Sequence, residues 1–394
     1  MKHIGIYLGV SRDAGGMFQY SETIFQSLMN LPQNEYQIVA VGASADWQEL
    51  LKDYPCIDSR VVPQQKLGEL LAFALISLTP SLSMARWINH LVNPSVASIN
   101  AMKFDLMMFP AQELLAGCVK LRKIVSVHDL MHRYEPGFPE VSSLGRYYLR
   151  EKRFKAIAEN AQLILTDSIV GKQQFQTAYD APLKGVASLP YCVPPLSDNP
   201  HENRCSLKDK YGLPEKFLFY PAQFWEHKNH RRLFLVLKKL KNEFSDIHLV
   251  VTGSNGTNSI ALKKFAEDIG VLSHITWCSE VSKHDLPQFF RDALGMVMPS
   301  FFGPTNIPPL EAMKFGCPMA ISRIYAMPEQ IGEAALYFDP ASLSEMTAAI
   351  QSLWSSRQIR DRMVRRGMER TTNWNEVTFE TRLHILVKEA LLPN

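Results

Sequence analysis

Short apolar runs alternate with longer helical stretches along the whole chain, and this alternation constrains the fold more than any other feature of the sequence. Apolar runs of strand length with amphipathic stretches between them are typical of parallel sheets wrapped by helices. The predicted strands of the first half are residues 4–8, 37–41, 106–109, 124–127 and 163–166, and those of the second half are residues 217–220, 248–252, 275–277, 295–298 and 319–321. Each half is therefore predicted to be an open, mostly parallel α/β sheet.

The segment CVPPLSDNPHEN, residues 192–203, separates the two halves, because its Pro, Asn and Asp content suits neither a helix nor a strand. With 394 residues the chain is long enough for two domains that each have a core. We predict a first domain over residues 1–195, a second over 196–372, and an amphipathic helix within 373–394. Ligands of open α/β sheets bind beyond the carboxyl ends of the strands. Polar residues that directly follow a strand are therefore the candidates for a site.

The composition is that of a globular enzyme, with 46% hydrophobic and 21% charged residues. A net charge of +3 is too small to indicate nucleic-acid binding, but it is compatible with an anionic substrate or a membrane surface. No signal-peptide pattern and no apolar stretch of about 20 residues is present, so we expect a cytoplasmic protein. The six cysteines never form a CxxC pair and are interpreted as thiols in a reducing compartment: Cys56, Cys118, Cys192, Cys205, Cys278 and Cys317.

The segment PSFFGPTNIPPLEAMKFGCP, residues 299–318, directly follows the predicted strand 295–298. It contains a turn-rich loop over residues 303–306 and then two consecutive prolines, which suit the first turn of a helix. A strand, a polar loop and a helix in this order direct free N–H groups and the positive end of the helix dipole toward the loop, which suits a phosphate. Glu311 is expected in the first turn, where its carboxylate would accept hydrogen bonds from ribose hydroxyls.

This segment resembles the donor-binding signature of the retaining glycosyltransferases of family 4, which have the GT-B fold. The signature has two glutamates separated by seven residues. Glu311 matches the second glutamate, and Gly303 stands where the first one contacts the transferred sugar. The resemblance implies that Thr305, Asn306 and the N–H of Ile307 bind the donor diphosphate. It also implies two Rossmann-like domains facing across a cleft, with a C-terminal helix that crosses back to the first domain.

Two motifs of the first half also follow predicted strands. Gly15 and Gly16 follow the first strand and let backbone N–H groups approach a phosphate or a sugar, although an ordinary turn between a strand and a helix is the alternative. His128 and Asp129 follow strand 124–127 in VHDLMHRYEP, which resembles the histidine–aspartate loop of the family and implies that His128 lies near the donor sugar. Asp129 would orient His128 or cap the next segment, and His132 would be a neighbour or exposed to solvent.

Lys228, in YPAQFWEHKNH after strand 217–220, is a candidate point charge for the diphosphate, and the alternative is a surface lysine at a helix start. The family usually places an arginine five residues earlier, where this chain has the uncharged Gln223. His227, Asn229 and His230 are the nearby polar groups that would compensate for it.

Two further segments of the second half resemble the family less closely. Gly253 follows strand 248–252 and would line the nucleotide pocket. Residues 282–286 resemble the segment that caps the base in the family, and they also suit an ordinary helix start.

Two stretches of the first half suit contact with a membrane. The apolar run LLAFALISL, residues 70–78, would seat on a bilayer or grip a lipid-linked acceptor, but the favoured interpretation is a buried helix. The basic run RYYLREKRFK, residues 146–155, is interpreted as a solvated face, and attraction to anionic lipid headgroups is its alternative.

We predict an enzyme that moves a sugar from a UDP- or GDP-sugar to a hydroxyl of a saccharide or lipid-linked acceptor with retention, in polysaccharide or glycoconjugate synthesis. The catalytic candidates are His128, Lys228 and Glu311. No metal or other cofactor is expected because the chain has no Asp-x-Asp motif. No nucleic-acid partner is expected, and peripheral contact with the inner membrane face is allowed. A non-catalytic sugar-nucleotide-binding subunit and a nucleotide-sugar epimerase of the same fold remain alternatives.

Overall fold

The chain forms two compact units, each built around one parallel sheet. The computed structural model describes residues 1–181, 185–193, 207–254, 256–279, 281–282 and 284–392. The first unit consists of Met1–Gly137, Val141–Pro194 and Glu376–Asn394, and the second consists of Phe138–Glu140 and Pro195–Asn375. Most of the segment predicted to separate the domains, residues 194–203, lies outside the described residues.

The first unit has a seven-stranded sheet in the order β3-β2-β1-β4-β5-β6-β7, in which every pair of neighbours is parallel. Its strands are β1 (Lys2–Tyr7), β2 (Tyr36–Val41), β3 (Asp58–Arg60), β4 (Leu106–Phe109), β5 (Lys123–Val127), β6 (Leu163–Thr166) and β7 (Val186–Ser188). Its helices are α1 (Gly16–Met29), α2 (Ala45–Leu50), α3 (Gln65–Leu78), α4 (Leu82–Val92), α5 (Pro94–Ala101), α6 (Met131–Tyr134), α7 (Pro139–Ser142), α8 (Arg146–Ala158), α9 (Ile169–Tyr179) and α18 (Glu376–Leu391).

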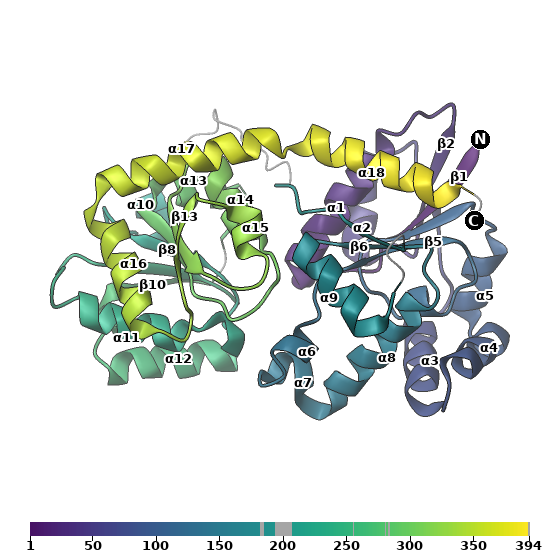
Figure 1. The fold of residues 1–394 in the computed structure, drawn as a ribbon, viewed down its shortest axis with the longest axis horizontal. Coiled ribbons are helices and arrows are strands. Elements are labelled where there is room, and N and C mark those ends of the chain that lie inside the picture. The colour runs from purple at the N-terminus through teal and green to yellow at the C-terminus, as the bar shows by residue number, and fades with distance from the viewer. Residues whose placement is uncertain (182–184, 194–206, 255, 280, 283, 393–394) are drawn as a thin grey trace. The chain divides into compact units, whose positions relative to one another are not determined.

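The second unit has a six-stranded parallel sheet in the order β10-β9-β8-β11-β12-β13 (Figure 1). Its strands are β8 (Leu218–Pro221), β9 (Leu249–Thr252), β10 (Ile275–Cys278), β11 (Gly295–Met298), β12 (Met319–Ser322) and β13 (Ala335–Phe338). Its helices are α10 (Leu207–Tyr211), α11 (His230–Leu240), α12 (Thr257–Asp268), α13 (Leu286–Asp292), α14 (Ile307–Lys314), α15 (Met327–Ile331), α16 (Leu343–Ser355) and α17 (Arg357–Asn373). Short 3-10 turns complete both units: η1 (Arg12–Ala14), η2 (Leu51–Asp53), η3 (Leu115–Gly117), η4 (Ser143–Gly145), η6 (Glu226–Lys228) and η7 (Leu272–His274).

The prediction of two Rossmann-like α/β domains is confirmed, and each predicted strand is present with small shifts at its ends. Three strands were not predicted, namely β3, β7 and β13. Each of them lies at the edge of a sheet and is short or only partly buried. β3 and β7 have no uninterrupted apolar run for sequence analysis to find, whereas β13, with the sequence ALYF, has a run that sequence analysis overlooked.

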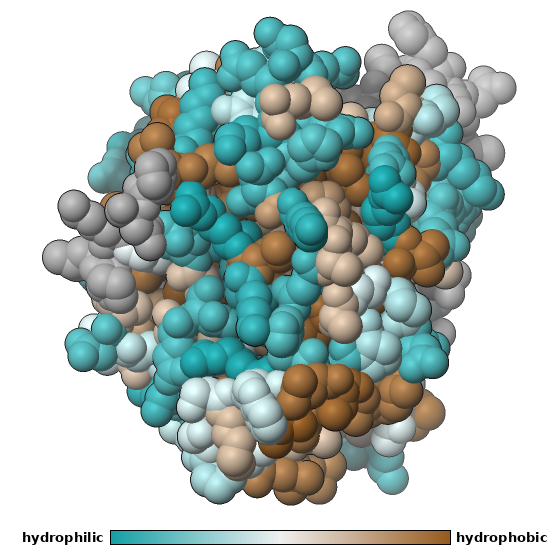
Figure 2. Space-filling model, turned by 90° about the vertical axis from the view of Figure 1, so that its right-hand side faces the viewer, coloured by the Kyte–Doolittle hydropathy of each residue, from teal (hydrophilic) through white to brown (hydrophobic). Residues whose placement is uncertain are grey.

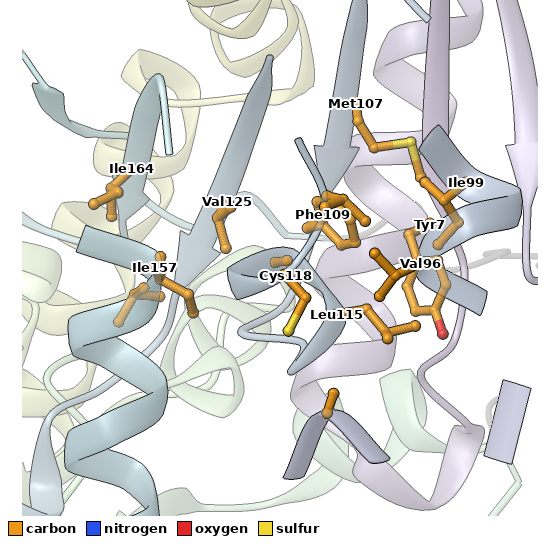
Figure 3. Packing of buried hydrophobic residues seen from close by; sticks show 14 of the residues in the cluster. Tyr7, Val96, Ile99, Met107, Phe109, Leu115, Cys118, Val125, Ile157 and Ile164 are labelled. Carbon is orange, nitrogen blue, oxygen red and sulfur yellow. The ribbon is translucent and has the colours of Figure 1, made fainter. Parts of the chain in front are cut away.

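The core of the first unit fills the space between one face of its sheet and the helices beside it. Figure 3 shows Met107 and Phe109, two positions apart on β4, on the same side of the sheet as Val125 of β5. Val96 of α5 and Ile157 of α8 belong to the same buried cluster. Alternate strand residues thus form a continuous apolar layer that supports the loops at the strand ends.

The last helix, α18, is part of the first unit and lies against α1. The buried side of α18 carries the apolar residues Phe379, Leu383, Leu386, Val387 and Ala390. Polar contacts fix it as well: Asn30 Nδ2 donates to Glu380 Oε2 at 2.6 Å, and the His384 ring is 2.7 Å from the carbonyl of Ser27.

One expectation about the first unit is corrected. Residues 70–78 do form a helix, α3, but the helix buries only the side that carries Gly68, Ala72 and Ile76. Leu70 and Leu78 are exposed, so the interpretation of this stretch as a buried helix is wrong for its large side chains. The basic stretch lies on α8, which buries Phe154, Ala156 and Ile157 and leaves Arg146 and Lys155 exposed.

Candidate functional site

The loop between β11 and α14 lies beside the middle of the second sheet and is held by the backbone of Asn306. β11 is fully buried and pairs with β8 and β12. The N–H of Asn306 donates to Gln330 Oε1 at 3.0 Å, and its carbonyl accepts from Gln330 Nε2 at 2.9 Å. Asn306 is the N-cap residue of α14. A side chain of α15 therefore fixes the position at which α14 begins.

The start of α14 offers fewer backbone donors than its sequence first suggests. Pro308 and Pro309 follow Ile307 and carry no N–H, so Ile307 is the one residue among the first three of the helix with an amide to donate. Glu311 is the fifth residue of α14 and is buried, so its expected place in the first turn is wrong. The difference arises because the helix already begins at Ile307, one residue before the prolines.

Gly303 is required by the backbone of this loop. Its φ of 104° lies in the region that favours glycine, and a Cβ there would be 2.8 Å from Asn306 Nδ2. A glutamate at this position would therefore strain the loop in the conformation that it adopts. Glycine instead of the signature's glutamate at position 303 therefore changes the side-chain chemistry of the loop and also permits its backbone conformation.

Lys228 reaches this loop from the neighbouring strand. It follows β8, and its Nζ is 3.5 Å from Asn306 Oδ1. Burial lowers the pKa of Lys228 to about 8, although the Glu140 carboxylate opposes this shift, so the amine is mostly protonated at neutral pH. The hydroxyl of Tyr220 donates to the Lys228 carbonyl at 2.8 Å, which fixes the backbone that carries the lysine. The structure thus brings together Lys228 and Asn306, two residues from separate motifs that the sequence analysis assigned to the diphosphate.

The neighbours of Lys228 are held inside the second unit, Asn229 by hydrogen bonds and His230 by ring contacts. Asn229, with a φ of 63°, donates to the carbonyls of Pro299 and Pro340 at 3.0 Å each, and so ties the β8 loop to the β11 loop. His230 is buried between the rings of Tyr220 and Phe224. Burial, with the charges of Lys228 and His227 nearby, lowers the pKa of His230 to about 3. The imidazole is therefore neutral at pH 7.

His227 stacks on Phe302 of the β11 loop, with ring centroids 3.7 Å apart. Its Nδ1 is 3.3 Å from Glu140 Oε1, and the N–H of Glu226 donates to the same oxygen at 2.6 Å. Burial alone would raise the pKa of Glu140, but these hydrogen bonds lower it to about 2. Sequence analysis missed Glu140, because it comes from a segment far away in the chain and no local pattern marks it.

The uncharged side chain of Gln223 joins two loops of the second unit by hydrogen bonds. Its Oε1 accepts from the N–H of Ser254 at 3.0 Å and from the Ser254 hydroxyl at 2.8 Å, which joins the β8 loop to the β9 loop. Gly253 makes this possible, because a Cβ there would be 2.8 Å from the Phe224 ring and 3.0 Å from the Ala222 carbonyl. In the segment resembling the base cap, Ser282 Oγ accepts from the N–H of Asp285 at 3.0 Å, and Lys283 lies outside the described residues.

In the first unit, Gly15 and Gly16 lie where a strand passes into a helix. Gly15 is the N-cap of α1, has a φ of 57°, and has no atom within 4 Å of the position a Cβ would take. Gly16 is the first residue of α1. The turn is therefore open on this side, which is compatible with both the ordinary turn and the ligand-binding interpretation.

His128 is buried, and both of its ring nitrogens have protein partners. Nδ1 is 2.7 Å from the Tyr191 hydroxyl and Nε2 is 3.1 Å from the Pro110 carbonyl. Burial lowers the pKa of His128 to about 4, so the ring is neutral at pH 7. Because a carbonyl only accepts, Nε2 carries the proton and Nδ1 accepts from Tyr191. Sequence analysis did not identify Tyr191, since it follows β7, one of the strands that were missed.

The contacts of Asp129 and His132 decide between the alternative roles that the sequence predicts for each. Asp129 Oδ1 accepts from the N–H of Met131 at 3.0 Å and also pairs with Arg150, so Asp129 caps the following segment. His132 is buried and its Nε2 is 2.6 Å from Glu151 Oε1, so the interpretation of His132 as solvent-exposed is wrong.

No group of three or more His, Cys, Asp or Glu side chains in the described parts of the chain is placed to hold a metal ion. Among the same residues, none of the helices is both long and apolar enough to span a bilayer.

Comparison with known structures supports the fold of both units together. The chain aligns with Anabaena HepE in complex with UDP and glucose at a TM-score of 0.74 and 13% identity, over 99% of this chain and 100% of that one. It aligns with the sucrose-phosphate synthase of Thermosynechococcus elongatus at a TM-score of 0.71 and 16% identity, over 99% of each chain. With its two parallel α/β units, the chain has the GT-B fold.

Sequence comparison shows which family the second half of the chain resembles. Residues 206–370 match the family model of glycosyl transferases group 1. The chain is 25% identical to O-antigen chain mannosyltransferase B of Escherichia coli over 62% of its own length and 65% of that protein. It is 24% identical to O-antigen chain mannosyltransferase RfbU of Salmonella typhimurium over 58% of its own length and 60% of that protein, so it spans less than two thirds of either relative. The second half of the chain is thus similar to the glycosyl transferases group 1.

Proposed function

We propose that the protein is a glycosyltransferase that moves a sugar from a nucleotide-diphosphate donor to a hydroxyl group of a saccharide or lipid-linked acceptor. The observation that carries this proposal is the convergence of Lys228 and the N-terminus of α14, with Lys228 Nζ 3.5 Å from Asn306 Oδ1. A cation beside a helix N-terminus is complementary to a diphosphate, and it stabilises the negative charge that the leaving group gains. Both elements lie within the residues that match the family model.

The proposed roles combine the family resemblance with the positions of the residues. Lys228 and the N–H of Ile307 bind the diphosphate, with Thr305 and Asn306 beside them. Glu311, on the next turn of α14, is assigned to the ribose. Gly253 and the Gln223–Ser254 tether shape the loops after β8 and β9 toward the nucleotide. Gly303 leaves its backbone to face the sugar.

The first unit would supply Gly15, Gly16 and His128. Gly15 offers an open turn at the start of α1. His128 would contact substrate only by exchanging its hydrogen bond to Tyr191 or to Pro110 for one to the substrate. In this proposal the His128 ring is neutral and contacts the substrate after giving up one of its two hydrogen bonds.

The proposed reaction retains the anomeric configuration, as in family 4, and needs no metal ion. The bond between the anomeric carbon and the phosphate oxygen breaks, and a bond from the acceptor oxygen to the same face of that carbon forms. The acceptor proton passes to the departing phosphate oxygen, and Lys228 stabilises the charge on the diphosphate. The sugar carries oxocarbenium character while this exchange takes place.

A mannosyl group is the first candidate for the transferred sugar, because both O-antigen relatives are named as mannosyltransferases. Their names also support a place in polysaccharide synthesis. The nucleotide is UDP or GDP, and the neighbouring Anabaena structure holds UDP. We propose a cytoplasmic location, supported by the free thiols of Cys56, Cys118, Cys192, Cys278 and Cys317.

The test is a turnover assay of the purified chain with a panel of UDP- and GDP-hexoses, GDP-mannose included, in the presence of EDTA. Saccharide acceptors are supplied, products are identified by mass spectrometry, and the anomeric configuration is read by NMR. We expect transfer from one donor with retention. Transfer should be lost in Lys228→Met and kept in Lys239→Met, a matched change of an exposed lysine on α11.

Three other results would contradict the proposal. Donor binding without turnover under all acceptors would favour the non-catalytic subunit. A changed sugar on the nucleotide without any acceptor would favour the epimerase. Inversion of the anomeric carbon, or a trapped glycosyl–enzyme adduct, would refute the proposed mechanism.

A further inference from the structure

Helix α3 presents large apolar side chains to solvent while it buries small ones. Gly68 and Ala72 are buried, and Gly68 is packed so closely that a Cβ would be 2.1 Å from Ser95 Oγ. Leu67, Leu70 and Phe73 lie on the other side of the helix and are exposed, with Leu70 at 64%. An apolar helix side of this kind is normally covered in a globular protein.

Helix α4 repeats the arrangement. Ala85 and Asn89 are fully buried, whereas Met84, Trp87 and Leu91 form an exposed stripe with the spacing of one helix side. Trp87 is 64% exposed and Leu91 is 63% exposed. The two exposed groups together are called the α3–α4 apolar face below, and they consist of Leu67, Leu70, Phe73, Met84, Trp87 and Leu91.

The two helices form a fixed antiparallel pair. Residues 79–81 connect them at one end, and at the other end Asn93 Nδ2 donates to the Gly68 carbonyl at 2.8 Å. Asn93 also bonds to Asn89 Oδ1 at 2.8 Å, which joins the end of α4 to its own buried side. Figure 2 shows apolar side chains gathered at the lower edge of this view, where Figure 1 places α3 and α4. The face is therefore preformed and does not require a helix to fold on contact.

A cationic pocket lies beside this face. A cavity of about 400 Å³ is lined by Thr79, Pro80, Ser81, Leu82, Ser83, Lys152, Lys155 and Glu159. Lys152 Nζ donates to the carbonyls of Ser77 and Thr79 at 2.9 and 3.3 Å, so α8 holds this lysine at the end of α3. Glu159 already pairs with Arg86 at 3.1 Å, which leaves the two lysines to set the charge of the pocket.

The exposed part of α8 continues this charge. Arg146 and Lys155 are exposed on it, together with the rings of Tyr147 and Tyr148, and Lys152 Nζ lies 4.7 Å from the centre of the Tyr148 ring. Arg150 faces inward, where it pairs with Asp129. The apolar face is thus bordered by cations and aromatic rings on the side of α8.

We propose that the α3–α4 apolar face docks on an anionic phospholipid bilayer, and that the pocket with Lys152 and Lys155 receives a lipid phosphate. Exposed leucines, a tryptophan and a border of lysine and arginine are what the interface of an anionic membrane attracts. An anionic membrane fits better than a second copy, because the cationic border on α8 is complementary to anionic headgroups. This inference does not depend on the proposed reaction.

The test is flotation of the full chain with vesicles of phosphatidylcholine alone and of phosphatidylcholine mixed with phosphatidylglycerol. We expect binding to the mixed vesicles that weakens with added salt, and about tenfold weaker binding to the neutral ones. A triple variant, Leu70→Gln, Trp87→Gln and Leu91→Gln, should bind the mixed vesicles at least about tenfold more weakly. Its control is Ile260→Gln on α12, which replaces an apolar residue that is 70% exposed outside the face.

The charge and the depth of insertion are tested separately. Lys155→Glu should weaken binding to the mixed vesicles only, and Lys239→Glu should leave it unchanged. Brominated lipid should quench tryptophan fluorescence of the native protein, and the quenching should fall in Trp87→Phe although that variant still binds.

Equal binding of the native protein and the folded triple variant would overturn the proposal, as would a lack of binding to any vesicle. Dimerisation in solution that the triple variant abolishes, without vesicle binding, would assign the face to a second copy instead. Turnover with water-soluble substrates is expected to be the same in the triple variant and the native protein, so a failure here is distinguishable from a failure of the proposed function.

Discussion

Replacing Lys228 by methionine should weaken donor binding and at the same time make the free protein more stable. A hydrogen bond between a charged group and its partner contributes about 1.5–3 kcal/mol, so the dissociation constant of the nucleotide sugar should rise about 12- to 150-fold. Lys228 Nζ is 3.5 Å from its neutral partner Asn306, which leaves its charge available for a diphosphate. Methionine keeps most of the volume of the side chain and removes the charge.

The stability change has the opposite sign because of the lowered pKa. Burial lowers the pKa of Lys228 to about 8 in the folded protein, whereas an unfolded lysine has a pKa of about 10.4. Between these values the unfolded chain binds a proton that the folded chain does not, so this residue makes the free energy of unfolding rise with pH in that window. Below pH 8 the buried charge carries its full cost, and Lys228→Met should therefore raise the free energy of unfolding at pH 7.

The assay is isothermal titration with the nucleotide sugar from about pH 6.5 to about pH 9.5, combined with urea unfolding of the free protein. For the native protein the dissociation constant should rise as the pH passes about 8, because the free amine loses its proton there. For Lys228→Met it should be weak and independent of pH over the same range. Unchanged affinity in the variant, or a loss of affinity that only follows a loss of stability, would refute the assignment of Lys228 to the diphosphate.

Three further predictions concern the loops around the same site. Gln223→Glu keeps an oxygen that accepts from Ser254, so stability measured by urea unfolding should change by less than about 1 kcal/mol, while the dissociation constant of the donor rises through charge repulsion. Gly303→Ala should lower the free energy of unfolding by about 1–3 kcal/mol, because φ is 104° there; an unchanged value would show that the loop relaxes freely. Glu140 has its pKa lowered to about 2, so it stabilises the fold above about pH 4.3 and loses that effect as the pH falls toward 2. Glu140→Gln should therefore lower the free energy of unfolding at pH 7 by about 1–3 kcal/mol and make it depend less on pH in the acid range. An unchanged free energy of unfolding would show that the pairing of Glu140 with His227 does not stabilise the fold.

The sheets could be predicted from the sequence because their central strands are continuous apolar runs. β11 is buried along its whole length and β8 at all but its last residue, and each such run has helical stretches on both sides. β3 could not be predicted, because the residues DSR at a sheet edge have no apolar pattern. The loops after β8 and β11 were predicted to carry a site, since the carboxyl ends of neighbouring parallel strands meet at one edge.

The partners inside the site could not be predicted in the same way. Gln330 holds Asn306, and Glu140 contacts the Glu226 backbone, yet both pairs are distant in sequence. The backbone conformation of Gly303 also has no signature beyond the glycine itself. These contacts depend on how the elements pack, which a local pattern does not contain.

The exposed side of α3 shows a different limit. A run as apolar as LLAFALISL indicates burial when only its mean composition is considered. The spacing of Gly68, Ala72 and Ile76, each four residues apart, marks the side that faces the core, and it leaves the larger leucines outside. Small residues with helical spacing were the available signal, because they permit the close approach to Ser95 that the structure shows.

The proposed diphosphate site is tested most directly by a crystal structure of the protein with the nucleotide sugar that it turns over. We expect the diphosphate to lie at the N-terminus of α14, with phosphate oxygens within hydrogen-bond distance of Lys228 Nζ and of the Ile307 N–H, and with the ribose toward Glu311. A diphosphate bound elsewhere, or bound at α14 without contact to Lys228, would contradict the proposed site.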